Sequence, residues 1–235
     1  MRNHLTIKRF CLLSLVAACC LAGCEKDNYD PPKAQLSGAL TYQGDSIGLS
    51  YDDVVFQLWQ PGFGKLTPIE VTVNQEGVFS ALLFKGDYKL VIPPGQGPFT
   101  GFLDSASDTL DVHVEGDRTM DIEVQPYYMI HSPQFELAGT TIQAHCSIAQ
   151  IVKGPLAKPV EQVALYIGKT RFLDTRTALA TARVKGADLN DLSAVALEKP
   201  LPKMTPEQDY VFVRLGVKIQ SVEDMIFSRV VRINY

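Results

Sequence analysis

The body of this sequence is almost without cysteine. Four of its five cysteines lie within the first 24 residues, and only Cys146 lies beyond them. A single cysteine cannot form a disulfide within the body, so the fold must be stabilised by a packed core. The 235 residues are 46% hydrophobic and 20% charged, which is enough apolar material for such a core and excludes a disordered chain.

An excess of positive charge is also missing. The chain has 22 Lys+Arg against 26 Asp+Glu, and removal of Arg2, Lys8 and Arg9 with a leader peptide would leave 19 against 26, a net charge of −7. Nucleic-acid binding depends on neutralising phosphates with Lys and Arg. We therefore expect no nucleic-acid partner.

Motifs of catalysis and cofactor binding are absent. The sequence contains no G-x-S-x-G, G-x-x-x-x-G-K, G-x-G-x-x-G or H-E-x-x-H. His113, His131 and His145 lie on separate segments, which does not indicate a zinc site. We expect no enzyme, no metal and no cofactor. A small hydrolase is a remote alternative, because paired carboxylates need not be neighbours in the sequence.

The longest apolar run, residues 10–21, has about a dozen residues, which suits a signal peptide and is too short to span a membrane. It ends in Leu21-Ala22-Gly23-Cys24 and resembles a bacterial lipobox. The resemblance implies that residues 1–23 are a signal peptide and that Cys24 is lipidated, which gives a stable membrane anchor. The alternative is an ordinary secretory signal with a chance cysteine.

Residues 24–33 are charged and proline-rich, as in a solvated tether. The segment 25–32 resembles the acidic motif that follows the lipidated cysteine in surface-exported lipoproteins of Bacteroidota. This implies a lipid-anchored outer-membrane protein that faces the cell exterior. Attachment facing the periplasm is the alternative.

From residue 34 onward, short alternating apolar runs are separated by Gly, Pro, Asn and Asp, which predicts an all-β chain with about seven strands in each half. Pro126 cannot extend a strand ladder. We therefore expect two consecutive β-sandwich domains, over 34–126 and 127–235. Tyr127 and Tyr128 stand at the domain junction, where we expect them to stiffen the hinge.

Two alternating runs in the second half predict which side chains face its core. Cys146 is in phase with Ile142 and Ile148, so we expect a buried thiol, with His145 on the opposite face. In residues 210–219, the series that starts at Val211 is a cleaner apolar face than the series that starts at Tyr210.

Several segments resemble known β-sandwiches. LSGALTY (36–42), VVFQLWQ (54–60) and EGVFSALLFKGDYKLVIP (76–93) resemble the carboxypeptidase regulatory-like, or transthyretin-like, domain. LPKMTPEQDYVFVRLGVKI (201–219) resembles an immunoglobulin or fibronectin-III-type domain. It departs from the fibronectin pattern because there Tyr210 and every second residue after it would face the core. Either a bulge resets the register or Tyr210 is not a tyrosine corner.

The whole mature chain, with PPGQGPF (93–99), DTLDVHVEG (108–116) and VQPYYMI (124–130), resembles an uncharacterised two-domain surface lipoprotein family of Bacteroidota. That family is associated with starch-utilisation-type glycan uptake systems. The resemblance implies a non-catalytic accessory role in polysaccharide capture. It also implies, as partners, a TonB-dependent transporter and its substrate-capturing lipoprotein. The alternative is a structural spacer or adaptor that contacts the transporter complex.

Aromatic side chains are the candidates for glycan binding, because their faces stack on the C–H groups of sugars. Trp59 lies on the opposite face from Phe56 and Leu58, just before a glycine-rich loop that contains Phe63. Packing against its own loop or the second domain is the alternative role of Trp59. Further candidates are Phe99 and Phe102, in the longest stretch without strand pattern, residues 93–108.

Three aspartates lie in or just after the same stretch, namely Asp104, Asp108 and Asp111. They could hold a calcium ion, but their spacing matches no EF-hand loop. Capping of turns is the simpler interpretation.

Overall fold

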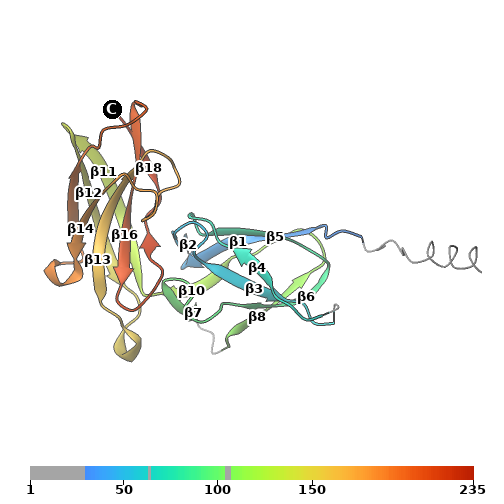
Figure 1. Ribbon diagram of the computed structural model, residues 1–235. Helices are drawn as coiled ribbons and strands as arrows, with labels where there is room; N and C mark the ends of the chain where they lie inside the picture. The colour runs from blue at the N-terminus through green and yellow to red at the C-terminus, as the bar shows by residue number, and fades with distance from the viewer. Residues whose placement is uncertain (1–29, 63–64, 104–106) are drawn as a thin grey trace, which may run out of the picture. The chain divides into compact units, whose positions relative to one another are not determined.

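The regular secondary structure of the described chain is almost entirely β-strand, which confirms the predicted all-β class. The structure is a computed structural model and describes residues 30–62, 65–103 and 107–235 (Figure 1). Within these residues the only helical elements are two short 3₁₀ turns, η1 (Gly154–Leu156) and η2 (Gly186–Asp188). No helix among them is long and apolar enough to cross a membrane.

The first domain is a sandwich of two sheets. Its strands are β1 (Ala34–Tyr42), β2 (Asp45–Ser46), β3 (Val55–Trp59), β4 (Ile69–Thr72), β5 (Val78–Leu83), β6 (Gly86–Val91), β7 (Phe99–Phe102), β8 (Thr109–Val114), β9 (Arg118–Thr119) and β10 (Ile122–Pro126). One sheet has the order β2-β1-β10-β7, with β5 and β9 also paired to β1, and the other has the order β4-β3-β6-β8. β1 runs parallel to β9 and β10.

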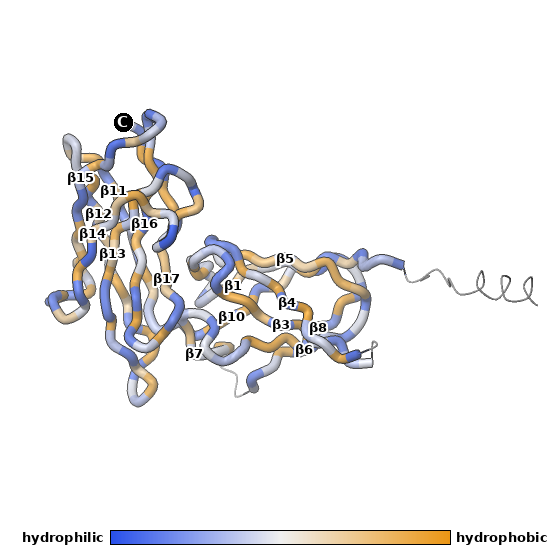
Figure 2. Tube along the Cα trace, viewed as in Figure 1, coloured by the Kyte–Doolittle hydropathy of each residue, from blue (hydrophilic) through white to orange (hydrophobic). Residues whose placement is uncertain are grey.

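The core of this domain lies between the two sheets, where the alternating apolar residues meet. Phe56 of β3 packs edge-to-face on Phe79 of β5, with ring centroids 4.9 Å apart. Leu36, Leu58 and Leu90 are fully buried beside them. Figure 2 shows the corresponding alternation of hydrophobic and hydrophilic segments along the chain. Burial of these side chains is the main favourable term in a body without disulfides.

The second domain is also a sandwich. Its strands are β11 (Tyr128–Ala138), β12 (Thr141–Gln150), β13 (Val160–Gly168), β14 (Ala180–Lys185), β15 (Val195–Pro200), β16 (Tyr210–Ile219), β17 (Ile226–Phe227) and β18 (Val231–Asn234). One sheet has the order β11-β12-β15, and the other has the order β14-β13-β16-β17, with β18 also paired to β16. Residues Lys33–Tyr235 form one compact unit that contains both sandwiches.

On β16 the predicted apolar face is confirmed. Val211, Val213 and the alternate residues after them are fully buried in the core. Tyr210 lies half-buried on the other face, with the Arg232 guanidinium 4.0 Å from its ring centroid. The only irregularity in the pairing of β13 with β16 lies on β13, between Val160 and Gln162, so no bulge in β16 resets the register. Tyr210 is therefore not a tyrosine corner.

One strand prediction was wrong in detail. β7 lies inside the stretch 93–108, which we expected to be irregular, because its Phe99 and Phe102 pair with β10 at the sheet edge. Near the C-terminus, β17 and β18 are separate strands that both pair with β16. Between β17 and β18, the Leu215 N–H of β16 donates to the Ser228 hydroxyl at 2.9 Å. A side-chain oxygen there replaces the backbone carbonyl oxygen that a continuous strand would offer.

The Cys146 thiol is expected to react slowly while the protein is folded. It is buried on β12, as the alternation predicts, and burial raises the pKa of the thiol to about 11. A chain expressed from residue 25 should therefore react with a thiol reagent about 100-fold more slowly when native than when unfolded. The matched control is Cys146→Ser with His145→Cys, which moves the thiol to the exposed face and should react quickly in both states. Equal rates for native and unfolded Cys146 would contradict its burial.

Candidate functional site

Trp59 occupies the face of β3 that its alternation predicts. Phe56 and Leu58 are buried, whereas Trp59 is half-buried on the opposite face. Its indole Nε1 donates to Gln57 Oε1 at 3.2 Å, so the polar edge of the ring already has a partner within its own strand. Phe63, the other candidate in this region, lies outside the described residues, as does Cys24. A glycan-binding role for Trp59 stays a prediction.

Phe99 and Phe102 come together at the edge of the first domain. Both line a pocket of about 550 Å³, together with Thr100, Gln125 and Leu156. Phe99 is buried and Phe102 is half-buried. Both rings therefore line the wall of this pocket, and a glycan-binding role for Phe99 and Phe102 stays a prediction.

Tyr127 and Tyr128 are buried at the junction between β10 and β11. The Tyr128 hydroxyl donates to the Lys158 carbonyl oxygen at 2.8 Å, and Lys158 Nζ lies 5.2 Å from the ring centroid of Tyr127. The Tyr127 N–H donates to the Pro98 carbonyl oxygen at 3.0 Å. The pair thus connects segments of both domains, which supports the expected role in the hinge.

The candidate metal ligands are not brought together in the part of the chain that the structure describes. No group of three or more His, Cys, Asp or Glu side chains is placed there to hold an ion. Asp104 lies outside the described residues, Asp108 is exposed, and Asp111 pairs with Lys89. His113 is exposed between Asp87 and Glu115, whose hydrogen bonds raise its pKa.

Two aromatic side chains that the sequence analysis did not single out lie together on the surface where the domains meet. Tyr51 follows β2 in the first domain, and Phe172 lies between β13 and β14 of the second. Their ring centroids are 5.5 Å apart, and their planes make an angle of 71°. The two residues remain 44% and 59% exposed. We call Tyr51 and Phe172, with the neighbouring Arg171 and Arg176, the aromatic seam.

A buried amide of the first domain holds the backbone on both sides of Phe172. Gln75 Nε2 donates to the Arg171 carbonyl oxygen at 3.0 Å, and Gln75 Oε1 accepts from the Leu173 N–H at 3.3 Å. Gln75 itself is buried, and its Nε2 also donates to Glu76 Oε1 at 3.1 Å, so loss of the bond from the Leu173 N–H would leave the Gln75 side-chain oxygen without a partner in the interior. The position of Phe172 against the first domain is therefore preorganised.

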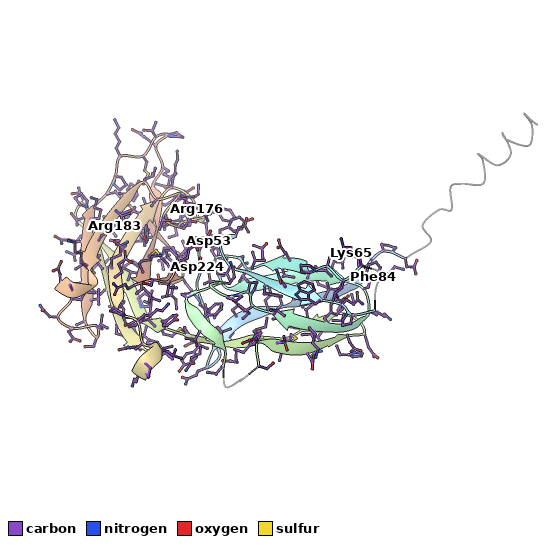
Figure 3. All side chains as sticks on the ribbon, turned by 60° about the horizontal axis from the view of Figure 1, so that its bottom comes forward. Asp53, Lys65, Phe84, Arg176, Arg183 and Asp224 are labelled. Carbon is purple, nitrogen blue, oxygen red and sulfur yellow. The ribbon has the colours of Figure 1, made fainter. Side chains whose placement is uncertain are left out.

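Arg176 connects the seam to carboxylates of both domains. Its guanidinium lies 3.1 Å from Asp53 Oδ1 and 2.7 Å from Asp174 Oδ2, and it donates to the Tyr51 carbonyl oxygen. Figure 3 shows Arg176 beside Asp53. Burial acts to raise the pKa of Asp174, but hydrogen bonds from Arg176 and Thr177 outweigh it and lower that pKa. Asp174 therefore stays ionised and holds the arginine in place at neutral pH.

Beneath the seam, a fully buried arginine joins the two domains. Arg214 Nη1 donates to the carbonyl oxygens of Leu49, 3.1 Å away in the first domain, and Leu173, 2.9 Å away in the second. Its Nε donates to the Ser228 carbonyl oxygen at 3.2 Å, and its guanidinium lies 4.1 Å from the ring centroid of Phe227. Burial lowers the pKa of Arg214 to about 9, so the group stays charged at neutral pH.

Close backbone contacts complete the domain interface. Gly48 forms an isolated β-bridge with Phe227, in which the Phe227 N–H donates to the Gly48 carbonyl oxygen at 2.9 Å. A Cβ at position 48 would lie 2.3 Å from the Phe227 carbonyl oxygen, so only glycine permits this approach. Nearby, Asp224 Oδ2 accepts from the Gly97 N–H at 2.6 Å. The interface is thus built from specific polar contacts as well as apolar packing.

The aromatic seam can stack on apolar ring surfaces of a ligand and offer hydrogen bonds beside them. Arg171 is exposed, with its Nη2 3.3 Å from Glu76 Oε1. Alternation could not reveal Tyr51 or Phe172, because both lie between strands. The signal in the sequence that could have identified them is an aromatic residue within a charged loop, as in SYDD (50–53) and TRFLD (170–174).

Comparison with known families finds matches over both domains. A family model described as the N-terminal domain of DUF3823, a protein of unknown function, matches residues 34–125. A second model, DUF3823_C, a domain of unknown function, matches residues 128–232. The comparison with curated proteins found no match.

Solved structures resemble the chain over most of its length. A DUF3823 family protein from Parabacteroides merdae is 32% identical, with a TM-score of 0.76, and the match covers 87% of this chain and 100% of that one. Another, from Bacteroides ovatus, is 27% identical, with a TM-score of 0.77 and coverage of 86% and 99%. A protein from Bacteroides uniformis is 17% identical, with a TM-score of 0.68 and coverage of 87% and 100%, which shows a shared fold alone.

Proposed function

We propose that this chain, which belongs to the DUF3823 family by both of its domains, is a non-catalytic protein that binds polysaccharide at the cell surface. The observation that carries the proposal is the exposed pair Tyr51 and Phe172, one ring from each domain. Large aromatic side chains that are held rigidly and yet left exposed are typical of binding sites. The Bacteroides uniformis protein that shares the fold has carbohydrate binding as its suggested activity, which is consistent with this class of ligand.

The composition of the seam favours a neutral or weakly charged glycan. Arg171 and Arg176 are both paired with carboxylates, and the body of the chain is acidic overall. A strongly anionic polysaccharide would therefore meet net repulsion on approach. A shallow site of two rings implies a modest affinity, with a Kd on the order of 10 μM to 1 mM.

The proposal includes the place where the protein acts. The lipobox and the acidic tether support lipidation at Cys24 and display on the outside of the outer membrane. There the protein would assist polysaccharide capture beside a TonB-dependent transporter and its substrate-capturing lipoprotein. The second candidate function is that of a spacer or adaptor that contacts the transporter complex. Exposed Phe172 and Tyr51 would also suit such a contact, because aromatic residues are enriched at protein interfaces.

Phe172→Ala and Tyr51→Ala are each expected to weaken glycan binding about 5- to 150-fold, because each removes one stacking ring, worth about 1–3 kcal/mol. The measurement is a panel of soluble neutral and acidic polysaccharides, tested by affinity electrophoresis and calorimetry on the chain from residue 25. Gln75→Ala keeps both rings but frees the backbone around Phe172, so it should weaken binding by a smaller factor.

Trp59→Ala and Phe102→Ala are the comparison variants, since they alter the other candidate aromatic residues. Loss of binding in either of them, with the seam variants unchanged, would move the site away from the seam. If no glycan binds and the intact protein co-purifies with an outer-membrane transporter, the adaptor function would replace the proposed one.

A further inference from the structure

Two of the most exposed large hydrophobic side chains lie at one end of the first domain. Leu66 is 57% exposed, in the segment between β3 and β4, and Leu82 is 60% exposed, near the end of β5. Gln60 Nε2 donates to the Lys85 carbonyl oxygen at 3.2 Å, which ties the segment after β3 to the turn after β5. The two leucines therefore belong to the same end of the sandwich.

The chain enters the first domain at this same end. β1 begins at Ala34, which pairs with Leu83, and the next residue pairs with Leu82. The predicted lipid anchor, Cys24, precedes this entry point by only ten residues. Ten residues span at most about 35 Å when fully extended. Acylation of Cys24 would therefore keep this end of the domain close to the bilayer.

Two lysines at this end can contact anionic headgroups locally, although the body as a whole is acidic. Lys65 and Lys85 are exposed, and within the described part of the chain neither ammonium group has an ion-pair partner. Figure 3 shows Lys65 and Phe84, the neighbour of Lys85, at the end of the first domain where the chain enters it. Two nearby carboxylates have partners on the surface, since Asp87 pairs with His113 and Asp117 accepts from the Gln35 N–H.

We propose that Leu66, Leu82, Lys65 and Lys85 form a membrane-docking end, which rests on a bilayer surface that carries anionic phosphate headgroups. Exposed leucines gain free energy by entering the headgroup boundary, and each lysine near an anionic membrane adds a favourable electrostatic contribution. Alone this surface would bind weakly. A short lipidated tether raises its effective concentration at the bilayer into the millimolar range, which makes docking favourable. The inference rests on the lipidation of Cys24 in the proposed function.

Docking at this end would present the aromatic seam away from the membrane. Gln75, which holds the backbone around Phe172, lies in the turn before β5, whereas Leu82 lies at the far end of that strand. The length of β5 therefore separates the docking end from the seam. A bilayer-docked first domain would direct Tyr51 and Phe172 toward the medium, where polysaccharide is met.

The test uses the full lipidated chain, purified and reconstituted into vesicles of phosphatidylcholine with and without phosphatidylglycerol. Leu66→Cys or Leu82→Cys, in a Cys146→Ser background, carries an environment-sensitive fluorophore, and lipid-borne quenchers report contact with the bilayer. We expect blue-shifted, quenched emission at both positions when phosphatidylglycerol is present. The matched control is Thr140→Cys, an exposed position in the second domain, which should stay unquenched.

Charge reversal separates docking from simple tethering. Lys65→Glu with Lys85→Glu should lower the ratio of docked to undocked protein by at least about tenfold. The control pair, Lys153→Glu with Lys203→Glu, reverses two exposed lysines of the second domain and should change nothing. Flotation with the vesicles is measured in parallel. Protein that floats but shows the same emission at positions 66, 82 and 140 would overturn the docking end and leave the lipid anchor standing. Protein that neither floats nor carries lipid would overturn the anchor and, with it, the docking end.

Discussion

Arg214→Ala is expected to lower the free energy of unfolding by about 3–5 kcal/mol. The substitution removes the donors from three buried carbonyl oxygens, those of Leu49, Leu173 and Ser228, and leaves a cavity beside Phe227. Because one of these oxygens belongs to the first domain, the two domains should also lose part of their cooperativity. In denaturant unfolding followed by far-ultraviolet circular dichroism, the midpoint should therefore fall to a lower denaturant concentration. The single transition should also begin to separate into two, one for each domain.

Arg229→Ala is the control for Arg214→Ala, because Arg229 is exposed on the same segment as Ser228. It should change the free energy of unfolding by no more than about 0.5 kcal/mol. Arg214→Lys keeps the charge but lacks the planar fork of donors, so an intermediate loss is expected. A loss of less than about 1 kcal/mol for Arg214→Ala would mean that the other contacts between the domains hold them together without Arg214.

Cys24→Ala should move the protein completely from the membrane fraction to the soluble fraction. The acyl chains contribute about 0.8 kcal/mol for each buried CH₂ group, and all of this is lost with the cysteine. The measurements are cell fractionation and incorporation of a labelled fatty acid. Protease accessibility on intact cells then tests whether the anchored protein faces the exterior.

Cys20→Ala provides the matched control, since it removes a cysteine of the predicted leader and leaves the lipobox ending in Cys24. This variant should keep both the lipid label and the membrane association. Unchanged membrane partition of Cys24→Ala without any lipid label would show that another feature holds the protein at the membrane.

The predictions from sequence succeeded wherever a side chain had only two faces to choose between. Burial of Cys146 on β12 and of Val211 on β16 followed from alternation, because adjacent residues in a strand point to opposite sides. Trp59 lies on the predicted face for the same reason. The paired strand β7 was missed because Phe99 and Phe102 carry no alternating pattern between their prolines and glycines.

Alternation did not predict the role of Arg214. It lies on the face of β16 opposite the core, a face that in a single sandwich would be exposed to solvent. In this protein that face is covered by the loop that contains Leu173 and by the first-domain segment around Leu49. Packing between domains therefore reverses the expected exposure of a charged side chain.

The sequence by itself determined that the chain is a two-part all-β protein with a lipobox-like leader, because strand alternation, turn residues and leader patterns are local in the sequence. The tertiary structure alone decided which exposed aromatic side chains come together. Tyr51 and Phe172 are 121 positions apart in the chain and meet only because Gln75, Arg176 and Arg214 hold the two domains together. No local pattern encodes that meeting, since it depends on contacts between loops whose conformations are set by the sandwiches that carry them.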